Sequence, residues 1–111
     1  MVPSIPDYVK YANEVLGPKL PAEVLAQIRA FEAKGDYINI KTSIKNYLVH
    51  STLKKIEDKL PSNMFFRVHR SFVINFSEIV DIEDNTVLVK QDIVPISRSL
   101  KSELIRKLNR L

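Results

Sequence analysis

The chain has 111 residues, a formal net charge of +4, 45% hydrophobic and 27% charged residues, and no cysteine. This length and composition fit one globular domain, and the lack of cysteine excludes disulfides, thiolate nucleophiles and Cys-based zinc sites. The sequence contains neither an apolar run near the roughly 20 residues of a membrane span nor a signal-peptide pattern, so we expect a soluble, cytoplasmic protein.

The first 33 residues fit helices by local rules. Val9, Ala12 and Leu16 recur at helical spacing, which predicts a short helix over residues 7–16, ahead of a Gly-Pro pair. Pro21 suits the first position of a second helix, and the apolar residues that follow share one helical face. These residues are Val24, Leu25, Ile28 and Phe31.

A hairpin and a short helix are predicted next. After a break at Gly35-Asp36, the β-rich segments Tyr37–Lys41 and Tyr47–His50 predict two paired strands. Ser51 can cap a helix over Thr52–Lys59, which the following proline would end. The inward-facing residues of this helix would be Leu53, Ile56 and Leu60.

The central stretch, from Phe65 to Asn75, interleaves large apolar residues with Arg, His, Ser and Asn. Alternation with period two predicts a half-buried strand with Phe66 and Val68, and less regularly Phe65, on the buried side. The polar residues of the stretch would lie on or beside the solvent face. These are Arg67, His69 and Arg70.

Three short strands are predicted after the central stretch. Ile79–Glu83 and Thr86–Val89 flank Asp84-Asn85, a pair that favours a tight two-residue hairpin. We expect the next turn at Gln91-Asp92. The segment Ile93–Ile96 then predicts an edge strand, because its proline cannot donate a hydrogen bond in the middle of a sheet.

The final helix would begin at a polar motif and carry most of the basic charge. Ser97 or Ser99 can cap it, while Arg98 would place a cation at the positive end of the helix dipole. A charge in an unfavourable position suggests a role outside the fold. From Ile96 onward the local net charge is +4, which favours a phosphate-bearing partner or an anionic membrane surface, although such helices are often only solubilising. The apolar stripe of the helix would comprise Leu100, Leu104, Leu108 and Leu111.

Three motifs occur in an order and at spacings that point to one family. The central stretch carries Phe66-x-Val68-His69-Arg70-Ser71-Phe72-x-Ile74-Asn75, and the last predicted strand ends in Pro95-Ile96-Ser97-Arg98. Upstream stands Ile28-x-x-Phe31-Glu32-Ala33-x-Gly35-Asp36-Tyr37. Together they resemble the LytTR DNA-binding domain. The resemblance implies a mainly β fold of LytTR-like antiparallel β-sheets with one short internal helix and a C-terminal helix.

The resemblance changes the interpretation of the N-terminal third. It places a strand over Ile28–Glu32, so we expect only a helical turn near Pro21–Leu25 ahead of that strand. The match extends from about Ile28 to the C-terminus. We expect residues 1–20 to form an N-terminal segment or linker of uncertain structure, and residues 21–111 to form the LytTR-type domain.

The resemblance also implies a DNA-binding surface made of loops at one edge of a sheet, which reach into successive grooves of the duplex. Arg70 and Arg98 are the expected base contacts, because a guanidinium presents two parallel donors to the O6 and N7 acceptors of guanine. Backbone or supporting contacts are expected from Lys34, Asp36, Lys41, His69, Ser71, Ser97, Ser99 and Lys101. Asp36 would be repelled by DNA unless it accepts a hydrogen bond from cytosine or orients a neighbour.

Several of these residues have a purely structural alternative. Arg70 could be one partner of a surface ion pair. The ring of His69 could pack and hydrogen-bond within the fold instead of touching a phosphate. For Asn75 we expect a side chain that bonds to backbone in a turn rather than one that reads a base.

The expected function is sequence-specific binding of double-stranded DNA by the output domain of a bacterial two-component transcriptional regulator, without metal or cofactor. The family implies a receiver domain in cis, a repeated promoter site, and a protein that is monomeric when free and paired on DNA. The alternative is a β-rich RNA-binding or protein-interaction module. A phosphoesterase built from His50, His69, Arg70 and Asp36 is disfavoured, because these residues lack metal-ligand spacing and the chain has only two glycines.

Overall fold

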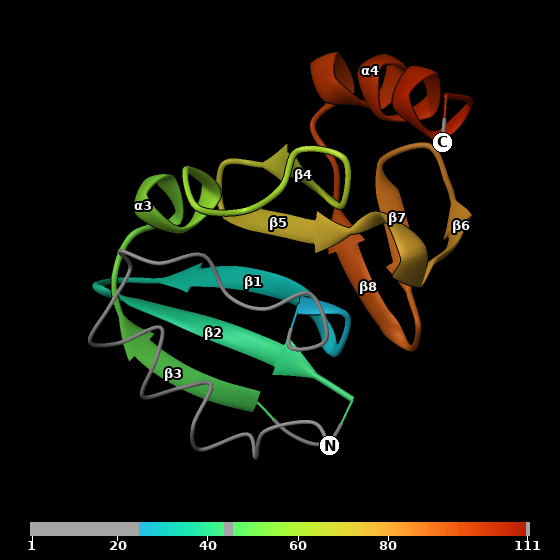
Figure 1. Cartoon of the computed structure of the whole chain (residues 1–111). Coiled ribbons are helices and arrows are strands. Elements are labelled where there is room, and N and C mark those ends of the chain that lie inside the picture. The colour runs from blue at the N-terminus through green and yellow to red at the C-terminus, as the bar shows by residue number, and fades with distance from the viewer. Residues whose placement is uncertain (1–24, 44–45, 111) are drawn as a thin grey trace.

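The computed structural model describes residues 25–43 and 46–110, which form two antiparallel sheets and two α-helices (Figure 1). In spatial order, the five-stranded sheet consists of β3 (Asn46–His50), β2 (Tyr37–Thr42), β1 (Ile28–Lys34), β5 (Phe72–Asn75) and β4 (Phe65–His69). The second sheet consists of β6 (Ile79–Ile82), β7 (Thr86–Val89) and β8 (Asp92–Pro95). The helices are α3 (Leu53–Glu57) and α4 (Arg98–Leu108), with a short 3-10 turn at Phe76–Glu78. The predicted fold class is confirmed.

The strand predicted over Ile28–Glu32 is confirmed, and it extends to Lys34. The alternative helical interpretation of these residues is wrong for a specific reason. A register shift between Ile28 and Ala30 marks a β-bulge, which brings Ile28 and Phe31 onto one face of the strand. A spacing of three therefore fits both a helix and this bulged strand. The helix predicted over residues 7–16 lies outside the described residues.

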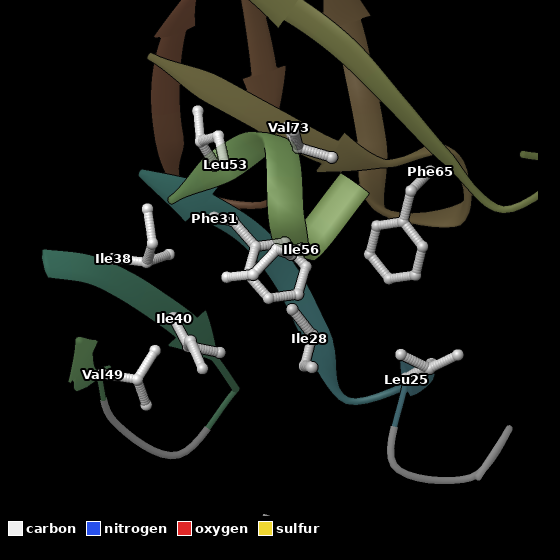
Figure 2. Close-up of a cluster of buried hydrophobic side chains, with 10 residues drawn as sticks. All are labelled: Leu25, Ile28, Phe31, Ile38, Ile40, Val49, Leu53, Ile56, Phe65 and Val73. Atoms are coloured by element: carbon white, nitrogen blue, oxygen red, sulfur yellow. The ribbon is translucent and has the colours of Figure 1, made fainter. Parts of the chain in front are cut away.

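Both faces of the five-stranded sheet are buried where β1, β5 and β4 lie side by side. Consecutive residues of a strand point to opposite faces, and Phe65 and Phe66 of β4 belong to two different clusters. The first core lies beneath α3 (Figure 2) and comprises Leu25, Ile28, Phe31, Ile38, Ile40, Val49, Leu53, Ile56, Phe65 and Val73. The second core lies against the small sheet and α4, and comprises Ala30, Phe66, Val68, Ile74, Phe76, Val87, Val89, Val94, Ile96 and Leu104. The predicted half-buried strand is thus buried on both sides.

The helix α3 is shorter than predicted, and its cap is a different residue. Thr52 has extended backbone angles, and its hydroxyl oxygen accepts a hydrogen bond from the Lys55 amide at 3.2 Å. Ser51, the predicted cap, is buried one residue earlier. Both residue types can cap a helix, so composition alone could not choose between them. Leu53 and Ile56 face the first core as predicted, and Leu60 packs against it from beyond the helix.

In the small sheet the predicted hairpin and edge strand are confirmed, but one turn lies at a different position from the predicted one. The Glu83 amide donates to the Thr86 carbonyl at 2.9 Å across Asp84-Asn85. The next turn is Lys90-Gln91 rather than Gln91-Asp92, and Lys90 takes the left-handed φ of 57°. Asp92 is not a turn residue, because it begins β8 and pairs with Val89. Its carboxylate lies 3.4 Å from the guanidinium of Arg29 on β1. This ion pair links the two sheets.

The side chain of Asn75 bonds to backbone atoms, as expected, but one of its partners is far away in the sequence. Its side-chain amide donates to the Ile28 carbonyl at 2.9 Å, and its oxygen accepts from the Ser77 amide at 3.0 Å. The residue is fully buried. Asn75 therefore holds the start of β1 against the end of β5.

Candidate nucleic-acid interface

Two backbone hydrogen bonds bring the three predicted segments to one end of the five-stranded sheet. The Ala33 amide donates to the Ser71 carbonyl at 2.9 Å, which joins the end of β1 to the β4–β5 turn. The Ser97 amide donates to the Val68 carbonyl at 2.8 Å, which joins the start of α4 to the end of β4. Because these bonds use backbone atoms, the side chains of the three segments remain available for other contacts.

The two predicted base-contacting residues are exposed and have no counter-charge in the described part of the chain. Arg70 occupies the β4–β5 turn, and Arg98 is the first residue of α4. Residues 25–43 and 46–110 provide neither of them with an ion pair, whereas Arg29, Lys41, Arg67, Lys90 and Lys101 each have one. The alternative role of Arg70 as a surface ion-pair partner is therefore not observed here.

The β1–β2 turn presents Lys34 and Asp36 on either side of Gly35. Both side chains are exposed, and Lys34 pairs with Tyr37 across the turn. Gly35 has a φ of 61°, a conformation that residues with a Cβ rarely adopt. The turn is therefore tight, and it holds its two charged side chains at the same end of the sheet as Ser71.

His69 and Ser71 make contacts within the fold. The Ser71 amide donates to Nδ1 of His69 at 3.1 Å, and the imidazole ring meets Phe72 edge-on with centroids 5.9 Å apart. The structural alternative for His69 is thus observed, and its Nδ1 is not available to a phosphate. Ser97 occupies the N-cap position of α4 without a side-chain capping bond, and Ser99 is exposed in the first turn.

Lys41 is not placed with the other candidates, whereas Lys101 lies in the first turn of α4, where its amide donates to the Ser97 carbonyl at 3.2 Å. Lys41 pairs with Ala30 in the far half of the β1–β2 hairpin, and its ammonium lies 3.7 Å from Glu32. Lys101 lies 3.8 Å from Asp84 of the β6–β7 hairpin. That hairpin is acidic, and a hydrogen bond that protonated Glu83 donates to Asp81, together with the negative charge of Asp81, raises the pKa of Glu83. Both lysines are therefore locally compensated.

Arg67 makes contacts that the sequence did not predict. It was expected on or beside the solvent face, and its side chain is 31% exposed, but its guanidinium bonds to Glu57 of α3 and to two carbonyls of the β4–β5 turn. Arg67 shares the strand face of Phe65, two residues earlier, and that face lies toward α3. The phase of the strand could have indicated this face, but no sequence signal identifies Glu57 as the partner.

Two further observations concern other site types. The described residues contain no group of three or more His, Cys, Asp or Glu side chains that could hold a metal ion. Among the same residues, no helix is long and apolar enough to cross a membrane.

Comparisons with known proteins converge on one family. A family model described as the LytTr DNA-binding domain matches residues 23–109. The sensory transduction protein LytT of Bacillus cereus is 38% identical over 80 residues, which cover 67% of this chain and 32% of the relative. The heme-containing CO-sensing transcriptional regulator RcoM 2 of Paraburkholderia xenovorans is 33% identical over 87 residues, 72% of this chain and 33% of the relative. This chain thus spans about a third of the length of the curated relatives it matches.

A solved LytTr DNA-binding domain from Bacillus cereus superimposes with a TM-score of 0.67 over 76% of this chain and 83% of that one. The sequence identity of this pair is 24%, so the likeness shows a shared fold.

Proposed function

Because this chain belongs to the LytTr DNA-binding domain family, we propose that it binds double-stranded DNA in a sequence-specific way, through loops that enter the grooves. One observation supports this proposal most strongly. Three segments distant in sequence are held together at one end of a sheet by backbone hydrogen bonds. Two of them present exposed guanidinium groups, those of Arg70 and Arg98, to which residues 25–43 and 46–110 provide no ion pair.

In this proposal Arg70 and Arg98, which lie on neighbouring segments of the protein, each contact a base. The bond between Val68 and Ser97 fixes the backbone from which both side chains extend, so the distance between the two segments is set before DNA binds. A rigid arrangement reduces the conformational entropy lost on binding. Each guanidinium would donate two parallel hydrogen bonds to a guanine edge in the major groove.

The phosphate contacts are proposed to come from residues around these two arginines. Lys34, Ser71 and Ser99 lie on the three segments themselves, as does Ser97. Lys41 and Lys101 would contribute only after release from Glu32 and Asp84, so we expect less from them. Asp36 would serve by accepting a hydrogen bond from cytosine or by orienting a neighbour. His69 would act indirectly, by holding the β4–β5 turn in shape, since its Nδ1 already accepts a hydrogen bond from the Ser71 amide.

For the whole protein we propose an output domain of a bacterial two-component regulator that acts in the cytoplasm. The named relatives are a sensory transduction protein and a transcriptional regulator, and this chain matches about a third of each. A receiver domain in cis, a repeated promoter site, and a monomer that pairs on DNA complete the proposal. The domain boundary near residue 21 is part of the same proposal.

A competition assay tests the proposal. The domain is first used to select its preferred site from random duplexes, without added metal or nucleotide. Labelled duplex carrying that site is then challenged with unlabelled duplex, single-stranded DNA and RNA. We expect a convergent motif and competition mainly by the duplex. RNA competing as well as the duplex would favour an RNA-binding module, and no binding to any nucleic acid would favour a protein-interaction module.

A further inference from the structure

Arg67 makes three polar contacts with a single guanidinium. Nε donates to the His69 carbonyl at 3.0 Å, one terminal nitrogen donates to the Arg70 carbonyl at 2.7 Å, and the other donates to Glu57 Oε1 at 2.9 Å. A guanidinium has its donors fixed in one plane, so it can hold two neighbouring acceptors in a set geometry. The two carbonyls belong to consecutive residues at the β4–β5 turn.

The backbone around this turn explains why it needs such a donor. The register of β4 and β5 shifts between Arg67 and His69, so the ordinary pairing of the two strands is interrupted just before the turn. The Val68 carbonyl is already bonded to Ser97. Within the turn, the contact from the Ser71 amide to the His69 ring is the other side-chain bond that the structure shows.

We infer that Arg67 is a positioning residue for sequence reading, and that it acts through the backbone of Arg70 without touching DNA itself. This inference rests on the proposed function and deepens it. Glu57 holds the other side of the guanidinium and so ties the turn to α3. A fixed backbone at Arg70 lowers the entropy that its long side chain must lose to reach a base.

The competing interpretation is that Arg67 contributes charge to the DNA-binding surface or only stability to the fold. A phosphate contact weakens binding to every sequence alike, whereas a positioning residue affects the preferred site selectively. Stability is also a weak explanation. The side chains of Arg67 and Glu57 are 31% and 44% exposed, and exposed ion pairs contribute little to folding.

The first experiment is a double-mutant cycle on DNA affinity. Arg67→Ala and Arg70→Ala, singly and together, are titrated against the selected site and a scrambled duplex. We expect Arg67→Ala to weaken binding to the selected site about tenfold, as for a lost hydrogen bond to a charged group, and to the scrambled duplex about twofold. In the Arg70→Ala background, Arg67→Ala should have no further selective effect, because the residue it positions is gone.

Two control variants separate charge from position. Lys54→Ala removes a cation from the exposed surface of α3 and should leave the ratio of the two affinities unchanged. Glu57→Ala removes a negative charge, so binding to the scrambled duplex should tighten slightly while the preference for the selected site falls. These opposite signs are not expected of a residue that acts by charge alone. Equal, additive losses for Arg67→Ala on both duplexes would overturn the inference.

The second experiment needs no DNA. Backbone ¹⁵N relaxation should show increased motion at residues 69–71 in Arg67→Ala and Arg67→Lys, with the sheets unchanged, since a lysine cannot span the two carbonyls and Glu57 together. A turn as ordered as in the wild type would contradict the inference. If Arg67→Ala does not fold, both experiments are done with Arg67→Lys and Glu57→Ala instead. A wild-type domain without sequence preference would instead refute the proposed function.

Discussion

Arg98 and Arg106 lie on the same helix, yet their positions differ in electrostatic terms. Arg98 is the first residue of α4, where the helix dipole is positive, and Arg106 lies in the last turn, where it is negative. Arg106 is thus stabilised by its own helix, and Arg98 is not. The proposed base recognition by Arg98 would give this unfavourable position a physical reason.

We predict that Arg98→Ala weakens binding to the preferred site by about 1–3 kcal/mol and changes non-specific binding much less. Arg106→Ala should have a small effect that is similar on all sequences and visible mainly at low salt. Both variants should fold, because neither side chain belongs to the buried side of α4. Fluorescence anisotropy titrations against preferred and scrambled duplexes measure both effects. Equal losses on both duplexes for Arg98→Ala would make it a phosphate contact.

Sequence patterns identified the two exposed arginines of the site but not how the site is held together. Arg70 and Arg98 were recognisable from their motifs, and both are exposed. The role of Arg67 depends on Glu57, ten residues away, and on a bulge that alternation does not encode. Lys41 is a second example, since its ion-pair partner Glu32 lies on another strand. Contacts across elements are therefore the part that local patterns miss.

At the scale of elements, β4 is the strand on which the site depends. Phe66 is 6% exposed and meets Phe76 with ring centroids 5.8 Å apart, while its neighbour Phe65 enters the other core. The sequence predicted this strand and its location correctly. It did not predict burial on both faces of the strand. Phe65 breaks the alternation of Phe66 and Val68, and its burial is explained only by the core on the other face of the sheet.

We predict that Phe66→Ala lowers the free energy of unfolding by about 3–5 kcal/mol, because the second core cannot refill the cavity. DNA binding should fall with the folded fraction. Ile93→Ala is the matched control, since Ile93 is 73% exposed and its loss should cost little. Thermal melts followed by circular dichroism compare the two. An unchanged melting temperature for Phe66→Ala would show that the side chain is not in the core.

The pair of Arg29 and Asp92 gives a test of how the two sheets are joined. Arg29 is 8% exposed, and its Nε has no hydrogen-bond partner in the described part of the chain. We expect Asp92→Ala to cost about 3 kcal/mol, the lower end for a broken buried pair, since a quarter of the Asp92 side chain is exposed. The double variant Arg29→Met/Asp92→Leu should regain most of this loss in denaturant titrations. A double variant less stable than Asp92→Ala would contradict this account.

At the scale of the whole molecule, the excess positive charge is not spread evenly. Arg70 and Arg98 lie on segments joined through β4, whereas the β6–β7 hairpin contributes Asp81, Glu83 and Asp84. DNA approaching the end of the large sheet would meet these two cations, to which the described residues provide no ion pair. The acidic hairpin lies beside the start of α4, because the Asn85 carbonyl accepts from the Ile96 amide at 3.0 Å and Asp84 lies 3.8 Å from Lys101. The net charge of +4 predicted an anionic partner, but the fold was needed to give it a direction.

We predict that the affinity for duplex DNA falls steeply with salt, with a log–log slope of about −0.9 for each phosphate neutralised. Titrations at several salt concentrations, with preferred and scrambled duplexes, measure this slope. Arg98→Ala should leave it nearly unchanged, because a base contact displaces no counterion, whereas Lys34→Ala should reduce its magnitude by about one contact. An affinity that does not depend on salt would exclude phosphate binding by this surface.

The two backbone bonds that join the three segments also bear on how such a domain could acquire new targets. The amides of Ala33 and Ser97 and the carbonyls of Ser71 and Val68 can make these bonds with any side chain except a proline at position 33 or 97, which would remove the amide donor. Substitutions at Lys34, Arg70 or Arg98 could therefore change the preferred site without disturbing the frame. A library randomised at these three positions should consist mostly of folded proteins, which makes the domain a scaffold for selecting new DNA specificities.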